Sequence, residues 1–139
     1  MYREAGGRLH SGPIWDYDNS SGNTSNLAAK DPHRLWAATR NNWYAGLPEY
    51  PEFRQLVGDE LERCEGIIRE TIDDRVDYVA EHGYDFKHNF LDKWSILGSR
   101  VCSNPAEFMV LTEWMEHVQY LRNWLFASLD ASIDTYCEA

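Results

Sequence analysis

Two aspartates in the run Gly-Pro-Ile-Trp-Asp-Tyr-Asp, Asp16 and Asp18, have the chemical type and spacing of metal ligands. If the run is extended, alternate side chains point to opposite faces, which places both carboxylates on one face and the rings of Trp15 and Tyr17 on the other. The turn that follows is rich in amide and hydroxyl oxygens, among them the amide of Asn23. Such oxygens suit a hard cation such as Mg²⁺ or Ca²⁺. The sequence therefore predicts a cation site at Asp16, Asp18 and Asn23.

A structural role for the two aspartates remains open from spacing alone. Asp is common at turns because its side chain accepts hydrogen bonds from nearby backbone N–H groups, so the pair could belong to an edge strand and cap the following turn. A calcium loop of the EF-hand type is excluded. Counted from Asp16, the glycine expected at its sixth position is Ser21, and the glutamate expected at its twelfth is Leu27.

The segment 8–18, followed by Gly22 and Asn23, resembles the metal-binding segment of the spore-coat-protein-H (CotH) kinase family. Members of that family show a glycine, a proline, an apolar residue and a Trp-Asp-aromatic-Asp run that ends in a glycine turn. Further along, the segments 42–47, 51–53 and 89–94 follow in the order and approximate spacing of the C-terminal part of the family. The resemblance spans most of the chain, and its first motif is the most specific.

This resemblance implies the C-terminal helical lobe of an atypical protein kinase that transfers phosphate from ATP to protein hydroxyls. Asp16 or Asp18 would correspond to the aspartate that holds Mg²⁺ at the ATP phosphates, with Asn23 a weaker ligand. The nucleotide-binding lobe, the phosphate-binding lysine and the catalytic base are expected upstream of this chain. No catalytic residue is therefore expected here, and the chain is expected to be a fragment that is inactive alone. Its partners would be the missing N-terminal lobe or a protein substrate, at a spore coat or cell surface.

Composition and charge exclude several other classes of protein. The 139 residues suffice for one domain, and 43% are apolar, which is typical of a folded chain. The net charge is −10, and residues 51–139 carry eighteen acidic and eight basic side chains, so binding to nucleic acid is not expected. No apolar run reaches the roughly 18 residues of a membrane span. Two non-kinase alternatives remain: a helical protein-interaction module, and a structural module stabilised by Ca²⁺.

The elements that would position the site are mainly helical. We expect a β-segment over 1–23, a loop and short helix over 24–50, and a helical bundle over 51–139, with four or five helices in a single domain. Apolar residues recur every three or four positions, and caps and glycines mark the ends, which predicts helices over 32–43, 51–82, 85–97 and 105–136. Glycine is unfavourable inside a helix, so the second is expected to kink or break near Gly58 or Gly66 and to form two helices.

Overall fold

The computed structural model describes residues 3–8, 10, 20–35, 40, 44–101 and 104–137, with the side chains at 86, 90 and 91 excepted. The fold is mainly α, as predicted. Its order is α1 (Leu27–Lys30), η1 (Pro32–Arg34), η2 (Leu47–Glu49), α3 (Pro51–Glu81), α4 (Gly83–Lys87), η3 (His88–Lys93), η4 (Ala106–Val110) and α5 (Trp114–Tyr136). The β-segment expected over 1–23 falls largely outside the described residues, and the described part contains no strand.

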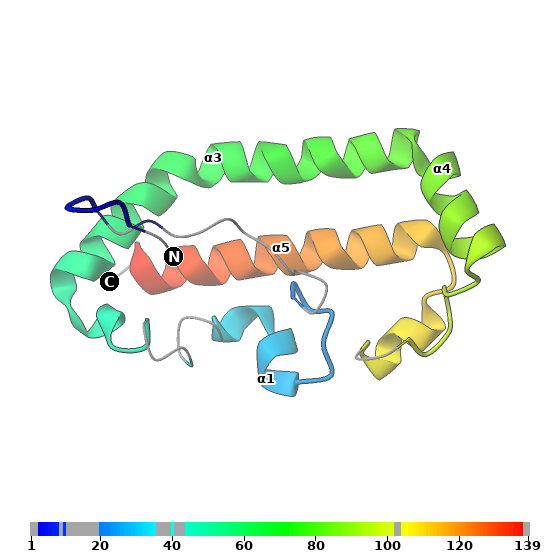
Figure 1. Cartoon of the computed structure of the whole chain (residues 1–139), viewed down its shortest axis with the longest axis horizontal. Helices are drawn as coiled ribbons and strands as arrows, with labels where there is room; N and C mark the ends of the chain where they lie inside the picture. The colour runs from blue at the N-terminus through cyan, green and yellow to red at the C-terminus, as the bar shows by residue number, and fades with distance from the viewer. Residues whose placement is uncertain are drawn as a thin grey trace.

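The long helices α3 and α5 lie side by side and run in opposite directions (Figure 1). Short segments from the N-terminal part of the chain lie beside α5, and α4 leads away from the far end of α3 (Figure 1). The core of the described part is thin, because its buried apolar side chains are Phe108 of η4 and Leu129 and Ala131 of α5. The helix pair is thus the body on which the N-terminal segments dock.

The predicted division of the first long helix into two helices is wrong. α3 is one helix of 31 residues, although its axis bends within its N-terminal half (Figure 1). Gly58 is buried where α3 meets the end of α5, and a Cβ atom placed there would lie 2.7 Å from the backbone oxygen of Tyr136. Close approach of two helices therefore explains this glycine. Gly66 is exposed and has open space around it, and α3 continues through this position without interruption.

Two predicted helices also begin or end elsewhere. The last does not start near residue 105: η4 stops at Val110, and α5 begins only at Trp114. Glu113 and Glu116 form a reciprocal capping box there, which satisfies the first N–H groups of α5. The helix expected over 85–97 is instead the short α4 followed by a π-helical segment, η3, that stops at Lys93.

The region between 24 and 35 is more ordered than a simple loop. The side chain of Asn26 accepts hydrogen bonds from the first N–H groups of α1, and Asp31 caps η1 in the same way. The Asp31-Pro32 start predicted for a helix over 32–43 is therefore confirmed. However, η1 ends at Arg34, because Leu35 adopts a left-handed backbone with φ 44°. Among the described helices, none is long and apolar enough to cross a membrane.

Candidate functional site

The predicted ligands Asp16 and Asp18 lie outside the described residues, whereas Asn23 lies within them. Asn23 ends a tight turn in which its N–H donates to the backbone oxygen of Ser20 at 2.9 Å. Both central residues of this turn have positive φ, 51° at Ser21 and 85° at Gly22. Positive φ at both central positions is the backbone of a primed turn, which glycine adopts without steric cost. The turn expected after the Asp motif is therefore present, and the chain reverses direction at Ser21 and Gly22.

Gly22 fixes this turn against α5. It is buried, and a Cβ atom at this position would lie 2.6 Å from Cδ1 of Trp124 and 3.0 Å from the hydroxyl of Tyr120. The Tyr120 hydroxyl also donates a long hydrogen bond of 3.4 Å to the backbone oxygen of Gly22. The turn can reach this depth only because glycine has no side chain. We call Gly22, Tyr120 and Trp124 the glycine slot.

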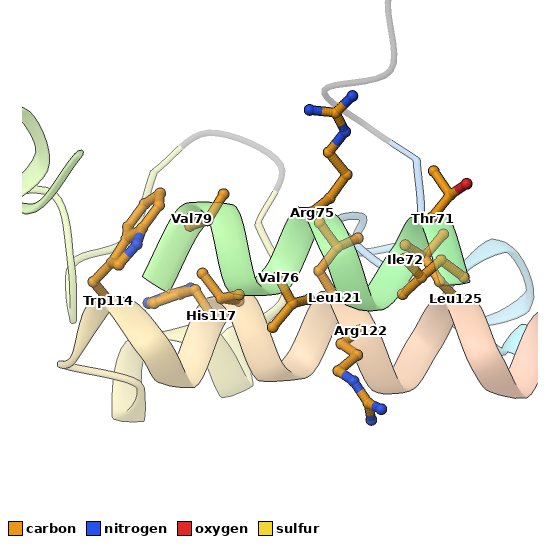
Figure 2. Close-up of a pocket in the computed structure, with 11 residues that line it drawn as sticks. Thr71, Ile72, Arg75, Val76, Val79, Trp114, His117, Leu121, Arg122 and Leu125 are labelled. Carbon is orange, nitrogen blue, oxygen red and sulfur yellow. The ribbon is translucent and has the colours of Figure 1, made fainter. Parts of the chain in front are cut away.

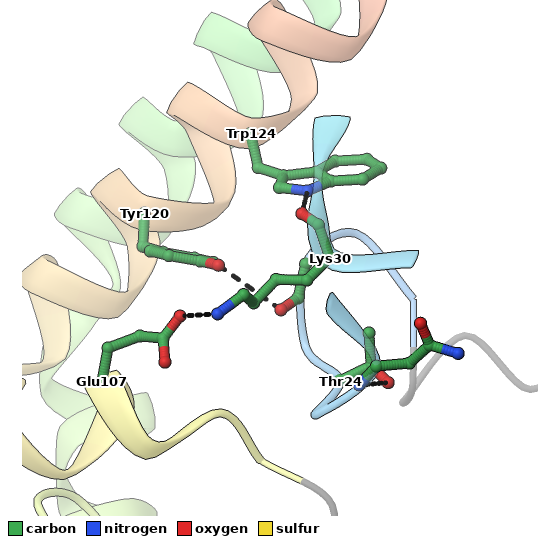
Figure 3. A network of polar contacts seen from close by, with 7 residues as sticks. Thr24, Lys30, Glu107, Tyr120 and Trp124 are labelled. Carbon is green, nitrogen blue, oxygen red and sulfur yellow. Dashed lines mark hydrogen bonds and ion pairs between the residues drawn. The ribbon is translucent and has the colours of Figure 1, made fainter. Parts of the chain in front are cut away.

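A second attachment lies eight residues further on, at Lys30. The indole Nε1–H of Trp124 donates to the backbone oxygen of Lys30 at 2.6 Å, and the Lys30 ammonium forms an ion pair with Glu107 of η4 (Figure 3). The hydrogen bond to Glu107 raises the pKa of Lys30, and the same bond lowers the pKa of Glu107. Burial raises the pKa of Tyr120, which keeps its hydroxyl protonated as a donor. Trp124 therefore holds both ends of the segment 22–30.

Asn23 borders a pocket of about 380 Å³ between the turn and the start of α5. Oxygen-bearing side chains of Ser20, Ser21 and Asn23 form one wall, and His117, Tyr120 and other residues of the helical body form the other. His117 is held by a 2.9 Å contact between Nε2 and the backbone oxygen of Leu111, so this nitrogen carries the proton and donates. It is thus a positioned side chain of the wall.

The turn side of this pocket carries neutral oxygen donors. The amide of Asn23 and the hydroxyls of Ser20 and Ser21 are oxygen donors, which Mg²⁺ and Ca²⁺ prefer. Within the described ranges, this pocket included, no group of three or more His, Cys, Asp or Glu side chains could hold a metal ion. Asp16 and Asp18, the ligands predicted from the motif, precede the turn by only a few residues in the sequence.

The attachments of the turn were missed by sequence reasoning. Tyr120 and Trp124 sit four residues apart on one face of α5, a spacing that indicates a shared contact surface but does not say with what. Lys30 and Glu107 are 77 positions apart in the chain. The sequence signal that was available is Gly22 itself, because a glycine directly after a polar turn residue marks positive φ.

Comparison with known proteins finds no family model, no curated protein and no solved structure that matches this chain. The geometry described above and the residues of the motif are thus the basis for a functional assignment.

Proposed function

We propose that this chain is the C-terminal helical lobe of a CotH-like atypical protein kinase and supplies its Mg²⁺-binding aspartate segment. The complete protein would transfer phosphate from ATP to protein hydroxyls. The chain alone would be inactive, because the adenine-binding groups, the phosphate-binding lysine and the catalytic base belong to the upstream lobe. The proposal rests on the Trp-Asp-Tyr-Asp motif and on the anchored turn that follows it.

The observation that carries the proposal is the double attachment of the segment 22–30 to α5. Gly22 sits in the glycine slot, and the backbone oxygen of Lys30 accepts the indole N–H of Trp124. A ligand on a loop is useful for catalysis only if a rigid element fixes it within a fraction of an ångström. A buried glycine against an indole ring holds the turn at one place on α5. The attachment thus supports a positioning role for the segment just before it.

In this proposal Asp16 and Asp18 hold Mg²⁺, and the amide oxygen of Asn23 is a further candidate ligand. When bound, Mg²⁺ would neutralise negative charge on the ATP phosphates. Mg²⁺ typically binds one or two carboxylates together with substrate phosphates, and two aspartates would therefore suffice from this lobe. The role of the described residues is to orient the ligands: Tyr120 and Trp124 hold the turn, and the ion pair between Lys30 and Glu107 ties its far end to η4.

The test is isothermal titration of the chain with Mg²⁺ and with Ca²⁺, each with and without ATP. We expect weak Mg²⁺ binding that is lost in the double variant Asp16→Asn, Asp18→Asn, and no ATP binding at micromolar concentration. The matched control is Asp74→Asn, Asp77→Asn, which makes the same chemical change at two exposed positions of α3. This control should bind Mg²⁺ as the wild-type chain does.

Two results would contradict the proposal. Equal loss of Mg²⁺ binding in both double variants would mean that the acidic surface attracts the cation without a site. Micromolar ATP binding would mean that the nucleotide site is contained in this chain, which would then not be a lobe awaiting its partner. A rise in melting temperature with Ca²⁺ that only the Asp16, Asp18 variant loses would favour the calcium-stabilised structural module, because a ligand specific to the native state stabilises it by mass action.

A further inference from the structure

Two ion pairs link α3 to α5 near the middle of the helix pair, and both involve an arginine that lies close to the ring of Phe126. Arg69 of α3 pairs with Asp130 of α5. In the opposite sense, Arg122 of α5 donates through Nε and Nη2 to Oδ1 of Asp73, at 2.8 and 2.7 Å. The guanidinium carbons of Arg69 and Arg122 lie 5.6 and 4.5 Å from the centre of the Phe126 ring, within the range of cation–π contacts. We call these five residues the ionic clamp.

The helix pair is closely packed on the side of the clamp that holds the N-terminal part of α3. Gly58 of α3 and Leu129 and Ala131 of α5 are buried there. At Gly58 the two backbones approach so closely that an added Cβ atom would lie 2.7 Å from a backbone oxygen of α5. We call residues 51–69 of α3 and 126–136 of α5 the closed half, because buried contacts run along its seam.

On the other side of the clamp the seam is less completely filled. A groove of about 540 Å³ lies between residues 71–79 of α3 and 114–125 of α5, and aliphatic side chains of the two helices point toward one another along it (Figure 2). The described residues that line it are all half-buried or exposed, and Leu121 keeps 44% of its surface exposed. Because protein interiors are normally close-packed, this part of the seam gains less from packing. We call its far part, residues 76–81 of α3 and 114–118 of α5, the open half.

We infer that the ionic clamp divides the helix pair into a half that stays closed and a half that opens while both helices remain folded. Local stability follows the density of buried contacts, which is higher in the closed half. Arg54 adds a cross-helix hydrogen bond there, from its guanidinium to the backbone oxygen of Thr135 at 2.7 Å. In the open half, separation of the helices exposes side chains that are already partly in water, so it removes less hydrophobic stabilisation.

The clamp also holds the stretch of α5 that carries the glycine slot. Arg122 lies between Tyr120 and Trp124 in the sequence, and residues two apart on a helix point about 200° apart. Arg122 therefore binds α3, whereas Tyr120 and Trp124 bind the N-terminal segment on the other side of α5. Opening beyond the clamp leaves the glycine slot in place. The inference concerns the two helices alone and does not depend on the proposed function or on a bound cation.

Distances between spin labels in the full chain test the division, with the three native cysteines replaced by serine. Labels at Glu62→Cys and Asp134→Cys span the closed half, and labels at Glu81→Cys and Met115→Cys span the open half. All four positions are exposed. We expect the open-half pair, measured by double electron–electron resonance, to give a distance distribution at least about twofold broader than the closed-half pair. Equal widths would overturn the inference.

A third pair of labels separates helix opening from helix fraying. Labels at Glu62→Cys and Glu81→Cys both lie on α3 and report whether its C-terminal end stays helical. This pair should give a distribution as narrow as the closed-half pair. A distribution as broad as that of the open-half pair would mean that α3 itself unfolds at this end, which would also overturn the inference.

Variants of the clamp show whether it sets the boundary. Arg69→Gln with Arg122→Gln removes both ion pairs, and the closed-half distribution should then broaden toward that of the open half. The matched control is Arg63→Gln, which removes an ion pair with Glu60 inside α3 and should leave both distributions unchanged. If the double variant loses its helical circular dichroism, Arg122→Gln alone replaces it. A closed-half distribution that stays narrow without the clamp would show that the clamp is not the boundary.

Discussion

Replacing Gly22 by alanine tests the anchored turn most sharply, because two separate costs can be assigned from the structure. The backbone φ of 85° is left-handed, which costs an alanine about 1–2 kcal/mol. The new Cβ would also lie 2.6 Å from Cδ1 of Trp124, closer than any ordinary contact, and relieving such overpacking typically costs about 1–3 kcal/mol. We therefore expect Gly22→Ala to lower the free energy of unfolding by about 2–5 kcal/mol.

The chain offers a matched control for each cost. Gly6 also has a positive φ, 74°, but nothing lies within 4 Å of its Cβ position, so Gly6→Ala carries the backbone cost alone. Gly66 lies inside α3 in open space, and Gly66→Ala should stabilise the chain by about 1 kcal/mol through helix propensity. Urea unfolding followed by helical circular dichroism gives all three values. If Gly22→Ala costs no more than Gly6→Ala, the turn does not sit against the indole ring, and the argument for an anchored ligand segment fails.

Two further predictions concern the helical body and the ion pair. Gly58→Ala should destabilise the chain by about 1–2 kcal/mol although alanine is the better helix former, because its Cβ would lie 2.7 Å from the backbone oxygen of Tyr136. If urea unfolding instead shows that the variant is more stable than the wild type, α3 and α5 do not meet at this position. Glu107→Gln should cost under about 1 kcal/mol near pH 7, since the partner of Lys30 is half-exposed. The hydrogen bond from Lys30 lowers the pKa of Glu107, so the ion pair contributes its full stability above the usual carboxyl pKa range and loses it as the pH falls. The difference in unfolding free energy between wild type and variant should therefore close below about pH 4. A difference that stays constant with pH would exclude the ion pair.

The helical part of the fold was predictable because one face of each long helix is apolar. A helical period is visible in α3, because its half-buried residues recur at three or four positions, and this period defines a helix whatever its partner is. These residues are Val57, Leu61, Cys64, Ile68 and Ile72. The division into two helices expected near Gly58 or Gly66 was not found, because intrinsic propensity is worth only about 1 kcal/mol and tertiary packing overrides it. A glycine required for close helix approach looks the same in sequence as one that ends a helix.

The candidate site was predictable only in part. The turn after the Asp motif was visible in the sequence, since Ser, Gly and Asn at adjacent positions favour a reversal. Its attachments were not visible, because Tyr120 and Trp124 contact residues 98 and 94 positions earlier in the chain. Contacts of that range depend on how the N-terminal segment returns to α5, and no local pattern encodes that path. The start of α5 was missed for a local reason, because the capping pair of Glu113 and Glu116 was overlooked within an apolar stripe.

The central claim is that Asp16 and Asp18 bind a divalent cation at the anchored turn, and paramagnetic broadening by Mn²⁺ in an assigned ¹H–¹⁵N spectrum tests it residue by residue. Mn²⁺ takes the same oxygen ligands as Mg²⁺. At substoichiometric Mn²⁺, the amide signals of residues 14–23 should broaden before those of the acidic helix α3, and Asp16→Asn with Asp18→Asn should abolish this selectivity. Broadening that begins on α3, or that is unchanged in the double variant, would contradict the claim.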